Sequence, residues 1–180
     1  NVLKGNFDIG ESYYFDALKL AEQNSETSDS DIMLIYAGLG TLYMFINSVD
    51  KAEEYLLRYS QLAKIVYGEF SPGYATAIQL LAVTAGVKKD HNKKMELTEK
   101  VVNIFEKLGN TNSPDYLRAL SMLAQGSLEV GNTERAKNIS NKLLNNSNLD
   151  IRGVSHGILG TIANSNQNYD TAENHFEESL

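Results

Sequence analysis

The sequence predicts an all-α protein, an α-solenoid of stacked antiparallel helix hairpins. Related segments recur along the chain at an interval of 42 residues, which is typical of a repeat architecture. Only two prolines occur among 180 residues, so long helices are not interrupted. No segment alternates apolar and polar residues in the way that a half-buried strand does.

Two parallel series of small residues define the repeat. One series lies near the start of the second helix of each hairpin, and the other lies twelve residues earlier, in the first helix. Because small side chains let two helix backbones approach closely, the matched positions indicate helix–helix contact points. The first series is Gly10, Ala52, Lys94, Ala136 and Ala172, at intervals of 42, 42, 42 and 36 residues and with Lys94 as its exception, and the second is Gly40, Ala82, Ala124 and Gly160.

Turn and capping residues predict where the helices begin and end. Asparagine, glycine or aspartate lies between the two series, and these residues tolerate left-handed backbone angles. Residues 5–10 align with these turns. Ser71-Pro72 and Ser113-Pro114 are also 42 residues apart, and each pair offers an N-cap hydroxyl followed by a proline at the first helical position. Asp29 occupies the equivalent place one repeat earlier.

In chain order, this pattern predicts nine helices with apolar residues at helical spacing. The first helix is the second half of a truncated repeat, so the chain holds about four and a half repeats in a single array and is expected to be a fragment of a larger protein. The helices are expected at 7–24, 30–46, 49–66, 73–87, 92–108, 115–129, 133–145, 150–164 and 169–180. The repeat boundaries are expected at 1–28, 29–70, 71–112, 113–148 and 149–180.

Composition excludes several classes of protein. Hydrophobic residues make up 42% and charged residues 22%, as in a folded globular chain and unlike a disordered or collagen-like one. No apolar run approaches the roughly 18 residues of a membrane span. The absence of cysteine excludes disulfides and thiolate chemistry, and a net charge of −7 argues against binding to nucleic acid. We expect a cytoplasmic protein, although the same composition is compatible with export.

The repeat resembles the tetratricopeptide repeat (TPR) in its long form, as in kinesin light chains and bacterial arrays. The family pattern places a large apolar residue before a Leu-small pair in the first helix, and then Ala, aromatic and Ala positions in the second. The best copies here are Tyr36, Leu39-Gly40, Tyr43, Ala52 and Leu56; Leu120, Leu123-Ala124, Ala136 and Leu143; and Leu159-Gly160, Ala172 and Phe176. The helix starts at Ser71-Pro72-Gly73-Tyr74-Ala75 and Ser113-Pro114-Asp115-Tyr116 also fit.

The resemblance implies a right-handed superhelix whose first helices line a concave surface that binds peptides or partner proteins without catalysis. One hairpin departs from the pattern, because Lys94 stands where alanine is expected and Thr98 where an aromatic residue is expected. The sequence therefore predicts that the 71–112 hairpin is looser than the others or kinks the stack.

No constellation of residues in the sequence indicates catalysis, a cofactor or a metal. His91, His156 and His175 lack the spacing of a metal site; His91 is expected in a turn, and His156 is expected in the core, where it needs a hydrogen-bond partner. Gly38-Leu39-Gly40 lacks the strand and the lysine of a phosphate-binding loop. The basic run from Lys88 to Lys94 is interpreted as a solvated turn, with an acidic partner or an anionic surface as the alternative.

Inward-facing positions of the first helices form the candidate partner-binding groove. The groove is expected to be apolar at one end and uncharged polar at the other. Only Arg118 is basic at the positions where the family's carboxylate-clamp members grip a terminal carboxylate, so a clamp of that kind is not expected. An apolar partner helix or an extended peptide is therefore expected. The alternative is that Leu34, Met44 and Phe45 pack against a further repeat. The candidate residues are Leu34, Ala37, Thr41, Met44 and Phe45, then Thr76, Gln79 and Val83, and then Arg118, Ser121, Gln125 and Glu129.

The function predicted from the sequence is a non-enzymatic scaffold that binds a protein or peptide partner, with no cofactor, no nucleic acid and no membrane. The alternative is that the repeats sense a signal peptide for a bacterial regulator, with an effector domain elsewhere in the parent chain.

Overall fold

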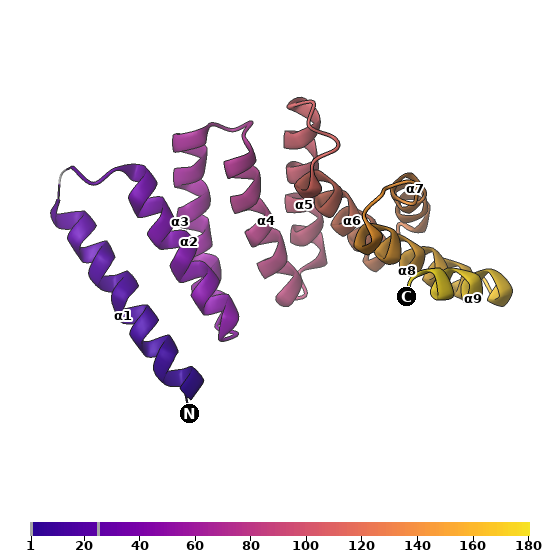
Figure 1. Cartoon of the computed structure of the whole chain (residues 1–180), viewed down its shortest axis with the longest axis horizontal. Helices are drawn as coiled ribbons and strands as arrows, with labels where there is room; N and C mark the ends of the chain where they lie inside the picture. The colour runs from indigo at the N-terminus through magenta and orange to yellow at the C-terminus, as the bar shows by residue number, and fades with distance from the viewer. Residues whose placement is uncertain (1, 25) are drawn as a thin grey trace. The chain divides into compact units, whose positions relative to one another are not determined.

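The described residues of this computed structural model, 2–24 and 26–180, form α-helices joined by short turns and contain no strand. Side chains are described from Phe7 onward, apart from residue 25. The prediction of an all-α fold is confirmed. The helices, labelled in Figure 1, are α1 (Val2–Gln23), α2 (Asp29–Phe45), α3 (Val49–Tyr67), α4 (Pro72–Val87), α5 (His91–Lys107), α6 (Pro114–Glu129), α7 (Thr133–Leu143), α8 (Leu149–Ser165) and α9 (Tyr169–Glu178).

Most helix ends lie within two residues of their predicted places, and α1 is the main exception. It was predicted to begin at residue 7, within a segment (residues 5–10) that aligns with the turns of the later repeats, but the helix begins at Val2 and runs through that segment. Of the residues that suggested a turn, Gly5 and Asn6 have side chains outside the described part of the chain. Gly10 lies within α1 and faces α2, because a Cβ added to it would lie 3.7 Å from the side chain of Leu42.

The chain divides into two compact units, Asn1–Asp90 and His91–Leu180. Unit 1 contains α1 to α4, and unit 2 contains α5 to α9. The boundary lies at the turn of the expected 71–112 hairpin, where the sequence departs most from the repeat pattern. Whether that hairpin is looser or kinks the stack stays a prediction, as do the repeat boundaries.

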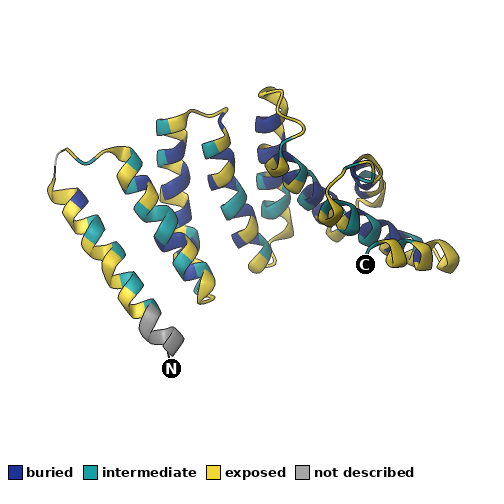
Figure 2. Cartoon of the chain, viewed as in Figure 1, coloured by how far each residue is buried: buried dark blue, intermediate teal, exposed yellow. Residues whose placement is uncertain are grey.

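In unit 1, the small positions of the repeat are contact points between helices. Gly40 of α2 lies against α3, because a Cβ added to it would be 2.6 Å from the side chain of Leu56. Leu56 and Ala52 are both fully buried. Figure 2 shows buried residues recurring along these helices among intermediate and exposed ones. Aromatic rings fill the space around them: Tyr43 stacks on Tyr55 at 5.5 Å between ring centroids, and Phe7 meets Tyr43 edge-on at 5.9 Å.

In unit 2, the same positions have the same role. Ala124 and Ala136 are fully buried where α6 packs against α7. Gly160 of α8 faces Phe176 of α9, whose ring would be 2.7 Å from an added Cβ. The interpretation of Gly40 and Gly160 as helix–helix contact points is confirmed.

The turns after α2, α4, α6 and α8 each contain one residue with a left-handed backbone. These residues are Asn47, Lys89, Gly131 and Gln167, with φ of 60°, 60°, 80° and 60°, so they recur at the same 42, 42 and 36 residues as the repeat. Only Asn47 and Gly131 are of the types that the sequence suggested. The positions of Lys89 and Gln167 show that the repeat geometry fixes this conformation even where the residue type does not favour it.

The helix starts at the serine–proline pairs are confirmed, and the one at Asp29 is not. The hydroxyls of Ser71 and Ser113 accept hydrogen bonds from the backbone N–H groups of Tyr74 and Tyr116, at 3.1 and 3.2 Å. In the earlier repeat Ser28 is the N-cap instead, because its hydroxyl accepts from the Asp31 N–H and the Asp31 carboxylate accepts from the Ser28 N–H. This capping box satisfies two otherwise unpaired donors at once.

Alanine substitutions at the two glycine contacts should have unequal effects. Gly40→Ala should lower the free energy of unfolding by about 1–2 kcal/mol, because overpacking against the fully buried Leu56 outweighs the higher helix propensity of alanine. Gly160→Ala should be close to neutral, because Phe176 is 41% exposed and can turn away. Denaturant melts followed by circular dichroism would measure both changes, and equal losses would contradict this account.

Candidate functional site

The exposed sides of α2 and α4 in unit 1 carry large apolar residues at helical spacing. Phe45 is 80% exposed, Leu34 is 62% exposed and Val83 is 41% exposed. The two helices lie side by side at one point, where the Thr84 hydroxyl is 3.6 Å from the sulfur of Met44. We call this surface the first-helix face of unit 1; it consists of Leu34, Ala37, Thr41, Phe45, Thr76, Gln79 and Val83.

An open groove of about 460 Å³ lies on this face, between α1 and α2. Ala37, Thr41 and Phe45, three of the predicted groove residues, line it together with Tyr14, Gly38 and Leu42. Gly38 allows α1 to lie close to α2, because the ring of Tyr14 occupies the place where a Cβ at residue 38 would stand, 2.3 Å away. The sequence did not indicate the contribution of α1 to this groove.

Polar groups on the first-helix face of unit 1 already have partners within the chain. The Thr41 hydroxyl donates to the carbonyl oxygen of Ala37 at 2.8 Å, and the Thr76 hydroxyl donates to that of Pro72 at 3.0 Å. Gln79 also has an interaction within the chain. This face therefore offers mainly apolar contact.

The candidate residues of unit 2 have a different character. Ser121 is only 7% exposed, so it adds little to a surface. Arg118 forms an ion pair with Asp115 at 3.2 Å, both of them exposed, and Gln125 is exposed. Glu129, predicted to line the groove, is instead the centre of an ion-pair cluster with Lys94 and His91.

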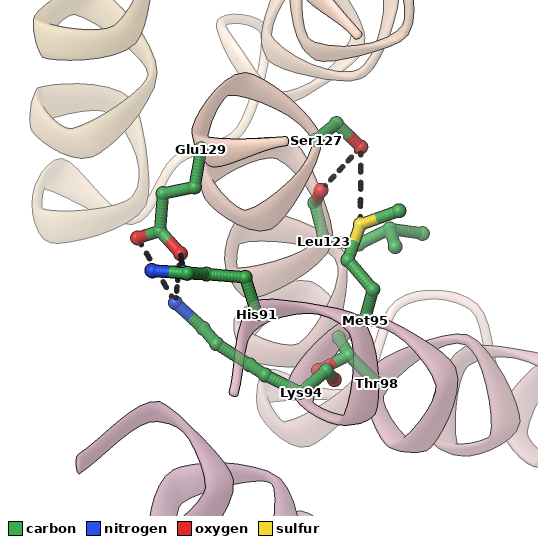
Figure 3. Close-up of polar contacts among 7 residues, drawn as sticks. All are labelled: His91, Lys94, Met95, Thr98, Leu123, Ser127 and Glu129. Atoms are coloured by element: carbon green, nitrogen blue, oxygen red, sulfur yellow. Dashed lines mark hydrogen bonds and ion pairs between the residues drawn. The ribbon is translucent and has the colours of Figure 1, made fainter. Parts of the chain in front are cut away.

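Figure 3 shows this cluster at the end of α6 and the start of α5. The Lys94 Nζ lies 3.1 and 2.9 Å from the two carboxylate oxygens of Glu129, and the His91 Nδ1 lies 3.0 Å from one of them. The side chain of Lys94 is 12% exposed and that of Glu129 is 26% exposed. Burial raises the pKa of the Glu129 carboxyl, but the hydrogen bonds from Lys94 and His91 outweigh it, and the net pKa is lower than usual.

The buried hydroxyl groups near Lys94 are hydrogen-bonded within their own helices, so they do not compete with Glu129 for the lysine. The Thr98 hydroxyl donates to the Lys94 carbonyl oxygen at 2.7 Å, so this buried polar group is satisfied within its own helix. On the facing helix, the Ser127 hydroxyl donates to the Leu123 carbonyl oxygen at 2.7 Å and lies 3.8 Å from the sulfur of Met95 (Figure 3). The lysine at residue 94 is thus compensated by one specific carboxylate.

Lys88, at the start of the basic run, also has partners within the chain. Lys88 lies 2.9 Å from Asp50 and 2.6 Å from Glu53 at the start of α3, and hydrogen bonds to these two carboxylates raise the pKa of Lys88. His91, predicted to lie in a turn, is the first residue of α5. The interpretation of the run as a solvated turn is confirmed for Lys88 and Lys89, which are exposed in the turn after α4. It is wrong for His91 and Lys94, which lie in α5 and pair with a carboxylate 38 and 35 residues away.

His156 and His175 form a second pair, between α8 and α9. Their Nδ1 atoms lie 3.1 Å apart and their ring centroids 5.3 Å apart, so one Nδ1–H donates to the other bare Nδ1. The hydrogen-bond partner that the sequence required for His156 is therefore the second histidine. Burial, and then the neighbouring His156, lower the pKa of His175.

Acid should loosen α9, because the His156–His175 pair shares one proton and cannot hold a hydrogen on both Nδ1 atoms. The pKa of His175 in the fold is below its usual 6.5, so the pair's contribution to stability is present above pH 6.5 and is lost as the pH falls through the lowered value. Hydrogen exchange should therefore show the amides of α9 opening more often at pH 5.5 than at pH 7.5, after correction for intrinsic exchange rates. The same pH dependence in a His156→Leu/His175→Leu variant would contradict this assignment.

Unit 2 also has an outer groove that the sequence analysis missed. It measures about 750 Å³ and lies between α5 and α7 over α6, with Val102 and Ile139 in its lining. Glu99 of α5 pairs with Arg135 of α7 within it. Glu99 and Arg135 are 36 residues apart in the sequence, whereas the repeat was recognised at an interval of 42 residues, so the repeat pattern did not point to this pair.

Other kinds of site find no support among the described residues. None of the histidines, aspartates and glutamates there gather in a group of three or more that could hold a metal ion. None of the helices searched has both the length and the apolarity that a membrane crossing requires.

Several solved structures match this chain over nearly its whole length. BtubC (BKLC) of P. vanneervenii matches 98% of this chain with 72% of its own at a TM-score of 0.83 and 18% identity. The TPR-like repeats of a putative kinesin light chain of P. anserina match 98% of this chain with 92% of their own at a TM-score of 0.71 and 18% identity. The chain has the TPR fold.

A further match within the TPR fold is the apo form of the quorum sensor NprR of B. thuringiensis, with a TM-score of 0.76 and 16% identity over 99% of this chain and 50% of that one. No family model matches the sequence, and no curated protein matches it significantly. At 16–18% identity these likenesses concern the fold. The predicted repeat boundaries would make α2, α4, α6 and α8 the first helices of their repeats and α1, α3, α5, α7 and α9 the second helices, and this assignment stays a prediction.

Proposed function

We propose that this chain is a non-catalytic scaffold that binds a protein or peptide segment on the first helices of its TPR repeats. The observation that carries the proposal is the first-helix face of unit 1, where Phe45 is 80% exposed and Leu34 is 62% exposed beside an open groove. Contiguous exposed apolar surface marks interaction sites in proteins that fold on their own. Fully burying a side chain such as phenylalanine contributes about 1.5–3 kcal/mol, so this residue is suited to anchor a partner.

A photo-crosslinking experiment on the full chain tests the proposal. A crosslinkable residue in place of Thr41, which lines the groove, should capture a discrete partner from the source cell's extract. The same residue in place of Leu57, which is exposed on α3, should not. Capture of the same species from both positions would contradict a binding role for this face.

Substitutions separate binding from folding. Phe45→Ser should weaken capture by the intact chain, while Ile65→Ser, which changes a 70% exposed residue on α3, should leave capture unchanged. Gln125→Ala tests whether the exposed side of α6 in unit 2 contributes to partner capture. Thermal melts of all three variants should match the parent, because each side chain is exposed. A parallel loss of melting temperature and capture would indicate a structural role for Phe45 instead.

A sensor role for the repeats is not proposed. The likeness to the quorum sensor NprR is one of fold, and it extends over half of that protein.

A further inference from the structure

We infer that the first-helix face of unit 1 binds an amphipathic α-helix with basic residues beside its apolar stripe, rather than an extended peptide. This inference rests on the proposed function and specifies the partner of that same surface.

The first argument is that the hydroxyl donors of the face are already used within the chain. An extended peptide that lies in a groove buries its own N–H and C=O groups, and these need hydrogen bonds from the receptor. The hydroxyl protons of Thr41 and Thr76 are already donated to their own helices, and Gln79 has an interaction within the chain. A helix satisfies its backbone internally and presents only side chains, so it suits a face of this kind.

The second argument is the shape and length of the apolar surface. Leu34 and Phe45 are eleven positions apart on α2, which corresponds to about 16 Å or three helical turns. The groove between them is open and measures about 460 Å³, which accommodates large apolar side chains projecting from a facing helix. A partner helix of about four turns covers the whole stripe.

The third argument is charge. None of the seven residues of the face carries a charge, but residues 1–48, which supply α1 and α2, contain seven acidic and two basic residues. Asp31 lies one turn before Leu34, on the same side of α2 by helical register. Of the basic residues later in unit 1, Lys88 is held by Asp50 and Glu53. The segment that supplies both walls of the groove is therefore acidic, and its negative charge favours a partner with basic flanks in both association rate and orientation.

Three synthetic peptides of 16 residues test the inference with the full chain. The first has leucine on one helical face and lysine on the other, and the second replaces every lysine by glutamate. The third is the first peptide with two central residues, one leucine and one lysine, replaced by prolines that prevent a helix. Fluorescence anisotropy at physiological salt gives the dissociation constants. The first peptide should bind at least tenfold more tightly than either of the others, and its circular dichroism should gain helicity on binding.

Protein variants show whether binding occurs at the predicted surface. Phe45→Ser should weaken binding of the leucine–lysine peptide at least tenfold, while Ile65→Ser should leave it unchanged. An unaltered affinity in Phe45→Ser would mean nonspecific attraction to an acidic protein and would overturn the inference.

The other outcomes separate the inference from the proposed function. If the proline peptide binds as tightly as the leucine–lysine peptide or more tightly, the partner is an extended peptide and not a helix. If the glutamate peptide does so, the partner does not need basic residues beside its apolar stripe. In both cases the inference fails and the proposed function stands. If no peptide binds, the inference also fails, and the crosslinking at Thr41 decides the proposed function independently.

Discussion

Replacing Ala136 by lysine should lower the free energy of unfolding of unit 2 by about 3–5 kcal/mol, the effect of a buried charge without a partner. Ala136 is fully buried where α7 meets α6. The equivalent residue one repeat earlier is Lys94, which is tolerated because it forms an ion pair with Glu129 at the end of α6. At the corresponding end of α8 the residue is Ser165, which supplies no carboxylate.

Urea melts followed by circular dichroism would measure this loss, with Asn141→Lys as the control. Asn141 lies on the same helix and is exposed, so a lysine there should change stability by less than about 0.5 kcal/mol. If Ala136→Lys melts like the parent chain, the assignment of residue 136 to the helix contact is wrong.

Removing the carboxylate of Glu129 should produce the second large effect. Glu129→Ala leaves Lys94, whose side chain is 12% exposed, without its counter-charge and should destabilise unit 2 by about 2 kcal/mol. The double variant Lys94→Ala/Glu129→Ala should recover most of that loss, because it restores the alanine found at residues 52, 136 and 172. A double variant no more stable than Glu129→Ala would show that Lys94 does not depend on this partner.

The same cluster gives stability a defined dependence on acid. The pKa of Glu129 in the fold is lower than its usual 4.5, so the contribution of the cluster is complete above pH 4.5 and is lost as the pH falls through the lowered value. The difference in stability between the parent and the Glu129→Ala variant should therefore shrink below pH 4.5. A difference that stays constant down to pH 3 would contradict the ionic origin of the effect.

The fold could be predicted from the sequence because its main contacts recur at a fixed interval. Gly40, Ala52 and Ala136 were recognised as contact points by spacing alone, and their burial follows from the close approach of paired helices. The helix starts at Ser71 and Ser113 follow from local chemistry, since a hydroxyl and a proline act within one turn. These features need no knowledge of which helices are neighbours in space.

The candidate site could be predicted only in part. The repeat register placed Phe45 and Thr41 on an exposed face, but it could not show that Tyr14 of α1 completes the groove over Gly38. Glu129 was assigned to the same face, yet the cations that hold it lie 35 and 38 residues earlier, at the start of another helix. Pairing of this kind depends on side chains that break the repeat, and a pattern built on what repeats does not contain them.

The ion pairs at Lys88 and at Glu129 have the same geometry with opposite polarity. In unit 1 the carboxylates of Asp50 and Glu53 begin α3 and the cation ends α4, as the helix dipoles favour, whereas in unit 2 cations begin α5 and the carboxylate ends α6. A second molecule that offered its α6 to the start of α3 would set Glu129 against Asp50 and Glu53, three negative charges in one place. The opposite polarity of the two sets of ion pairs therefore favours the native helix pairing over the exchanged one, and it disfavours exchange of helices between copies of the chain.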